Sequence, residues 1–103
     1  MSKRSKEYLD NREEEILKVA LGLAKKHGYT KITRGDIALS AKVSPGLVSK
    51  YLGTMTALRR TIMRQAVARR IPEIVAQGLA DKNRYAIKAP DELKNLALSV
   101  LVK

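Results

Sequence analysis

The chain has 103 residues, enough for one compact domain around a single hydrophobic core. It has no cysteine, which excludes disulfides and thiolate metal sites, and no apolar run long enough to span a membrane. Its net charge of +11 is concentrated between residues 16 and 71, where twelve Lys and Arg occur with a single acid, Asp36. Such a segment attracts polyanions, so nucleic acid is the first partner to consider, with a merely solvated surface as the simpler alternative.

The spacing of polar and apolar residues predicts an all-α fold, beginning with a polar arm and one helix. Residues 1–10 show no periodicity, and we expect a flexible basic arm there. The first helix begins near Asn11, which can cap it, and stops at Gly28. Three acids at its start suit the positive helix end better than they suit a catalytic carboxylate pair. His27, in its last turn, is better explained as a helix C-terminal cation than as a metal ligand or base.

Two short helices joined by a tight turn follow. The second is expected over 33–41, because Thr33 and Asp36 have the spacing of a capping box. The third is expected over 44–52, with Pro45 in the first helical position, where its missing N–H costs nothing.

The C-terminal half predicts a longer fourth helix and then shorter pieces. The fourth helix is capped by Thr54 and ends or kinks at Pro72. Residues 71–79 suggest a further helical piece, residues 81–89 a connection, and Pro90 the start of a last amphipathic helix. We therefore expect one or two short helices after the fourth.

A support helix followed by two helices of about eight residues and a tight turn between them is the pattern of a helix-turn-helix. Its last helix would place its N-terminal end in the major groove of DNA, where Lys50 can donate to guanine or to a phosphate. The expected DNA contacts are the exposed residues of this helix, the helix starts and the turn: Thr33, Arg34, Lys42, Ser44, Pro45, Gly46, Leu47, Ser49, Lys50 and Tyr51. Two alternatives stay open, since Leu47 and Tyr51 can belong to the core and Thr33 and Ser44 can act as caps alone.

Residues 12–58 keep the spacing of a known DNA-binding region without a gap. The matching residues are Arg12, Ile16, Leu17, Ala20, Gly28, Tyr29, Thr33, Ile37, Ala38 and the run Ala41-Lys42-Val43-Ser44-Pro45-Gly46. In these residues the chain resembles the tetracycline-repressor (TetR) family, which usually has glycine at the position of Lys42. The resemblance implies a three-helix DNA-binding unit of a bacterial, phage or plasmid repressor, acting in the bacterial cytoplasm or nucleoid.

The chain also departs from the TetR pattern. Family members usually carry a tyrosine, then an aromatic residue or histidine, then a phenylalanine along the recognition helix, where this chain has Ser49, Tyr51 and Leu52. A lysine that commonly touches a phosphate is replaced by Met55, and Arg59 or Arg60 can compensate for it. Family members carry a long ligand-binding domain after the fourth helix, whereas we expect the residues after position 58 here to be too few to enclose a drug-sized cavity. No small-molecule inducer is therefore expected.

The sequence predicts three segments: a flexible basic arm over 1–10, a TetR-like DNA-binding domain over 11–70, and a short helical dimerisation segment over 71–103. More apolar surface lies on the last segment than one small core needs. The expected contacts between two copies are Ile74, Leu79, Leu93, Leu96, Ala97, Val100 and Leu101. The alternative is a monomer in which the last helix folds back onto the first.

These patterns favour a sequence-specific double-stranded DNA-binding transcriptional regulator, most simply a repressor that binds a palindromic operator as a homodimer. One alternative is an architectural or recombination accessory protein, and another is a basic amphipathic module that binds a membrane or a partner protein. No enzyme activity, cofactor or metal is expected, since the sequence shows no nucleophile–base arrangement and no phosphate-cradling glycine loop.

Overall fold

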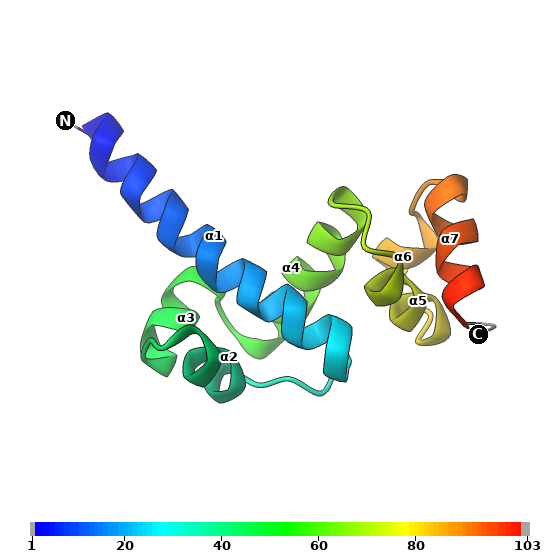
Figure 1. Cartoon of the computed structure of the whole chain (residues 1–103), viewed down its shortest axis with the longest axis horizontal. Coiled ribbons are helices and arrows are strands. Elements are labelled where there is room, and N and C mark those ends of the chain that lie inside the picture. The colour runs from blue at the N-terminus through cyan, green and yellow to red at the C-terminus, as the bar shows by residue number, and fades with distance from the viewer. Residues whose placement is uncertain (1, 102–103) are drawn as a thin grey trace.

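Helices make up all the regular structure of residues 2–101, the part of the chain that the computed structural model describes, with side chains described from Asn11 to Leu101. The expectation of an all-α fold is confirmed for these residues (Figure 1). The seven helices are α1 Ser2–His27, α2 Arg34–Ala41, α3 Pro45–Leu52, α4 Met55–Ala68, α5 Pro72–Ala80, α6 Arg84–Ile87 and α7 Asp91–Leu101.

Helix α1 is longer than predicted. It begins at Ser2 and not near Asn11, so the prediction of an arm without helix over the first ten residues is wrong from Ser2 onward. The sequence there has no apolar stripe, so the spacing of its residues could not reveal a helix. At the other end the prediction holds, because the helix stops at His27, directly before Gly28.

The side-chain caps predicted for α2 and α3 are present. Thr33 Oγ1 accepts a hydrogen bond from the Asp36 N–H at 3.1 Å, and Asp36 Oδ2 accepts one from the Thr33 N–H at 3.0 Å, which closes the capping box. Ser44 Oγ accepts from the Leu47 N–H at 3.2 Å, and Pro45 occupies the first turn of α3. These local bonds fix where both helices begin.

One cluster of buried apolar side chains extends from Ile16 of α1 to Ala97 of α7, with α4 at its centre. Helix α4 packs against α1 and α3 on one side and against α5 and α6 on the other, so its side chains Leu58 and Ile62 are fully buried. Figure 1 shows α5, α6 and α7 gathered at one end of the molecule, away from α2 and α3. Helix α7 packs mainly on α5 and not on α1, which differs from the alternative in which the last helix folds back onto the first.

The segment after α4 contains three helices, where one or two were expected. The additional helix is α6, which lies inside the predicted connection over 81–89. Asn83 caps it, because its Oδ1 accepts hydrogen bonds from the N–H groups of Tyr85 and Ala86. A single turn of four residues is too short to show helical periodicity, and burial of Ala86 against its neighbours adds to the Asn83 cap in holding it in place.

Candidate nucleic-acid interface

Helix α3 presents some of its predicted contact residues to solvent and buries others in part. Pro45, Gly46 and Lys50 are exposed. Leu47 and Tyr51 are half-buried and pack against the core, so the alternative that they belong to the core is correct for part of each side chain. Lys50 is therefore the long polar side chain of this helix with the greatest freedom to reach a ligand.

A hydrogen bond joins α2 to α3 across this surface. Arg34 Nη1 donates to Ser49 Oγ at 2.8 Å, and both side chains retain access to solvent. The bond orients the guanidinium toward α3 and uses one acceptor site of the hydroxyl, whose own hydrogen is still able to donate. Two residues that were predicted separately as DNA contacts, Arg34 and Ser49, are thus joined by a direct hydrogen bond.

The starts of α2 and α3 meet at a surface hollow of about 550 Å³. It is lined by eight residues from three helices and the cap of α2: Thr33, Arg34, Gly35, Pro45, Gly46, Ser49, Met55 and Arg59. Five of the predicted contact residues are therefore brought together. Both helix starts carry partial positive charge, and two guanidinium groups add full charges, so the hollow is suited to an anion such as a phosphate.

Arg59 lines this hollow although it was not among the predicted DNA contacts. It was considered only as a substitute for the contact that Met55 cannot make. Its Nη2 donates to the carbonyl oxygen of Thr30 at 3.2 Å, while its Nε is buried and has no hydrogen-bond partner among the described residues. The guanidinium is thus held near the hollow with donor capacity left over.

The turn between α2 and α3 places Lys42 elsewhere. Lys42 is exposed and has a φ of 61°, in the left-handed region, and the Val43 N–H donates to the carbonyl oxygen of Ala38 at 3.0 Å. Lys42 lines a separate hollow beside α1, which it shares with Arg12. Lys42 therefore does not join Arg34 and Ser49 in the hollow at the starts of α2 and α3. Ser44, which caps α3, directly precedes Pro45, one of the residues that line that hollow.

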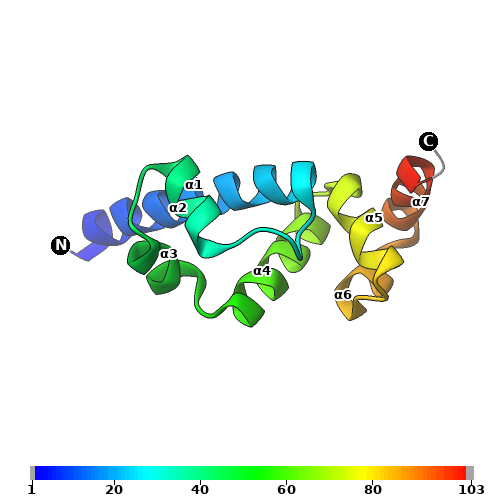
Figure 2. The same ribbon diagram turned by 90° about the horizontal axis from the view of Figure 1, so that it is seen from below.

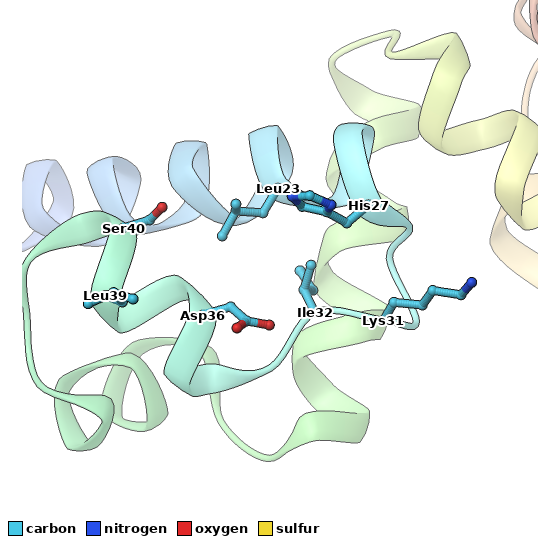
Figure 3. Close-up of a pocket in the computed structure, with 7 residues that line it drawn as sticks. All are labelled: Leu23, His27, Lys31, Ile32, Asp36, Leu39 and Ser40. Carbon is cyan, nitrogen blue, oxygen red and sulfur yellow. The ribbon is translucent and has the colours of Figure 1, made fainter.

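A further hollow of about 510 Å³ lies between α1 and α2 and contains none of the predicted DNA contacts (Figure 3). Leu23 and His27 come from α1, and Leu39, Asp36 and Ser40 come from α2. Leu39 is 84% exposed, the most exposed large apolar side chain in the described part of the chain. Asp36 is already committed to its capping bond with Thr33.

Polar bonds connect the segment that precedes α2 to α5. The Tyr29 N–H donates to Gln77 Oε1 at 2.8 Å, and Gln77 Nε2 donates to the carbonyl oxygen of Ala24 at 2.9 Å. Tyr29 OH donates to Asp81 Oδ2 at 2.7 Å. Burial, and then this bond to Asp81, raise the pKa of Tyr29 above its ordinary value.

An ion pair joins the other end of α4 to α1. Arg69 donates through both terminal nitrogens to the two carboxylate oxygens of Glu14, at 2.6 and 2.7 Å. This bidentate contact lowers the pKa of Glu14 below its ordinary value.

The residues predicted for dimerisation fall into two groups. Ile74, Leu93 and Ala97 are fully buried inside the core of one chain, where α5 and α7 pack together, so their surface is already used there. Leu79 and Val100 are half-buried, and Leu96 and Leu101 are each 49% exposed. The sequence did not single out two further exposed apolar side chains, Leu98 on α7 and Ile87 on α6.

Comparisons with protein-family models, with curated proteins and with solved structures found no match. The resemblance to the TetR family therefore rests on the residues of this chain alone. None of the helices described over residues 2–101 is long and apolar enough to cross a membrane. Among the described side chains, no three His, Asp or Glu residues gather where they could hold a metal ion.

Proposed function

We propose that this chain is a sequence-specific double-stranded DNA-binding transcriptional regulator in which α2 and α3 act as a helix-turn-helix. The observation that carries the proposal is the hollow at the starts of these helices, with Arg34 and Arg59 at its wall. A DNA phosphate in this hollow would bring the N-terminal half of α3 against the duplex. Lys50, on the same short helix and exposed, would then contact base edges in the major groove.

In this proposal the residues of α3, together with Arg34 of α2, have different roles in DNA recognition. Pro45 and Gly46 carry little side-chain bulk at the helix start, which allows the backbone to approach DNA closely. Arg34 and Ser49 would hold the phosphate and fix the register, and Lys50 would supply base discrimination. Leu47 and Tyr51 would contribute only through their exposed parts, since both also pack on the core.

The backbone at Lys42 gives separate support. The residues between α2 and α3 resemble the TetR pattern except that lysine replaces the usual glycine. Lys42 has a φ of 61°, a conformation that glycine adopts without steric cost. The turn therefore has, at this position, the backbone conformation that explains a glycine in the TetR pattern.

We further propose that the regulator is a homodimeric repressor of a palindromic site in the bacterial cytoplasm or nucleoid. A single recognition helix reads few bases, and two-fold symmetry doubles the contact. Leu96, Leu98 and Leu101 on α7 leave apolar surface for a second copy, since each is about half exposed. In this proposal, control comes from protein level, proteolysis or a partner and not from a small-molecule inducer inside one chain.

The proposal is tested by removing the positive charge of Lys50 from α3. Lys50→Ala is expected to weaken binding to a duplex selected by the protein by about 1–3 kcal/mol, while leaving binding to random duplex nearly unchanged. Lys18→Ala, which removes the same charge from an exposed position of α1, is the matched control and should change neither. Wild-type discrimination in the Lys50 variant would show that α3 does not read the bases.

A further inference from the structure

A second basic hollow lies beyond α3, between α4 and α6. It has a volume of about 330 Å³, and Arg59 and Arg60 of α4 line it together with Asn83 and Tyr85. Arg59 also lines the hollow at the starts of α2 and α3. The two hollows are therefore neighbours on one surface, with this arginine between them.

This surface carries excess positive charge. The guanidinium of Arg84 lies over the ring of Tyr85, 5.6 Å from its centre, and Tyr85 lines the second hollow. Within residues 11–101, no acid forms an ion pair with Arg59, Arg60 or Arg84. The single acid at the hollow is Asp81, whose Oδ2 already accepts the hydrogen bond from Tyr29.

The arrangement of the helices makes this surface continuous with α3. Figure 2 shows α3, the N-terminal end of α4 and α6 following one another along the lower side of the molecule. Arg59 and Arg60 lie on the first half of α4, which is the part between α3 and α6. Arg59 and Arg60 thus lie on the helix between α3 and α6, and α6 carries Arg84.

We propose that the phosphate backbone of bound duplex DNA continues from the α3 hollow across Arg59 and is held by Arg60 and Arg84 on α4 and α6. This inference rests on the proposed function, because it extends the same DNA contact. Bidentate guanidinium groups suit phosphate oxygens, and the stack on Tyr85 orients Arg84 before binding. The C-terminal segment would then add affinity without reading sequence.

The test measures how duplex affinity depends on salt. The probe is a labelled random-sequence duplex of about three helical turns, titrated with the full chain over a series of salt concentrations. Arg60→Ala and Arg84→Ala are each expected to reduce the steepness of log affinity against log salt by about 0.9, the value of one lost phosphate contact. Arg60→Lys and Arg84→Lys keep the charge and should restore the slope. Lys18→Ala controls for net charge.

Asp81→Asn tests the same surface through an expected increase in duplex affinity. It removes the acid from the second hollow and keeps an oxygen that can accept from Tyr29 OH, so duplex binding should become tighter. Thermal unfolding of every variant checks that the fold is kept. Salt slopes for Arg60→Ala and Arg84→Ala equal to that of Lys18→Ala, together with unchanged affinity of Asp81→Asn, would overturn the inference.

The outcomes separate this inference from the proposed function. If the wild type does not bind duplex at all, both are wrong. If Lys50→Ala loses discrimination while Arg60→Ala and Arg84→Ala leave the salt slope unchanged, the DNA contact ends at α3 and only the extension is wrong. If Arg60 and Arg84 change the slope but Lys50→Ala keeps wild-type discrimination, the extended contact stands and sequence reading by α3 is wrong.

Discussion

Replacing Gly78 by alanine tests the packing that holds α5 and α6 onto α4. A Cβ atom at this position would lie 2.6 Å from Met63 Cε, 2.9 Å from Met63 Sδ and 2.7 Å from Ala86 Cβ. The end of Met63 can move, but Ala86 Cβ is attached directly to the backbone of α6, so that helix must shift. The shift is opposed by the Asn83 N–H, which donates to the carbonyl oxygen of Gly78 at 2.8 Å.

The expected size of the effect follows from two opposing terms. Alanine stabilises a helix interior by about 1 kcal/mol relative to glycine. Overpacking a tight core costs about 1–3 kcal/mol, and contacts below 3.0 Å on two sides place Gly78→Ala at the upper end. The net loss in the free energy of unfolding should be about 2 kcal/mol, or about 8–16 °C in Tm for a domain of this size.

Gly22→Ala is the matched control, because a Cβ there meets nothing within 4 Å and the residue is exposed in the C-terminal part of α1. It should stabilise the chain by about 1 kcal/mol through helix propensity alone. The assay is urea unfolding followed by circular dichroism for the wild type and both variants. Equal stabilisation by the two substitutions would refute the close approach of α5 to α4 and α6.

Three other predictions concern side-chain bonds and the surface of α7. Tyr29→Phe should lower the free energy of unfolding by about 0.5–1.5 kcal/mol, since it removes the hydrogen bond to Asp81. Because the pKa of Tyr29 is raised in the folded chain, this difference should be constant below pH 10.0 and shrink at higher pH. A difference that stays constant above that pH would argue against the bond. Glu14→Gln should cost about 0.2–1 kcal/mol at neutral pH, as expected for an accessible ion pair; because the pKa of Glu14 is lowered from 4.5, its contribution should be lost as the pH falls below that value, and denaturant midpoints that stay apart in acid would contradict this. In light scattering at micromolar concentration the wild type should be a dimer, and Leu96→Glu with Leu101→Glu a helical monomer, so a monomeric wild type would exclude the dimer.

The central helices were predictable because their signals are local. The start of α2 is marked by the capping box of Thr33 and Asp36, and the start of α3 by the cap Ser44 with Pro45 in the first turn. These signals span only a few residues. The first turns of α1 and the whole of α6 were missed, because neither carries an apolar stripe long enough to show helical spacing. The capping bonds of Asn83 were visible in principle, but nothing in the sequence says that the helix after it is buried.

The candidate site was only partly predictable because it depends on how helices cross. Arg34 and Ser49 were expected to contact DNA, but their mutual hydrogen bond joins residues from two helices. Arg59 of α4 reaches the hollow at the starts of α2 and α3 because the three helices pack together there, and no local pattern encodes that packing. Lys42 was expected at the same site from its place in the turn, and the path of the backbone directs it to another hollow.

The dimer residues show the same limit. The apolar stripe of α7 was read from spacing alone, which cannot tell whether a neighbouring helix or a second copy will cover it. Packing on α5 buries Leu93 and Ala97 and leaves Leu96 and Leu101 at the flanks. Sequence periodicity thus found the stripe but not its partner.

The claim that α3 reads DNA sequence is tested most directly by selecting duplexes from a random pool with the full wild-type chain and then measuring its affinity for the selected and for random duplex at physiological salt. We expect enrichment of a palindromic site that is bound about 10³–10⁷ times more tightly than random duplex, with the two half-sites about one helical turn apart. A pool without enrichment, or equal affinity for selected and random duplex, would contradict it.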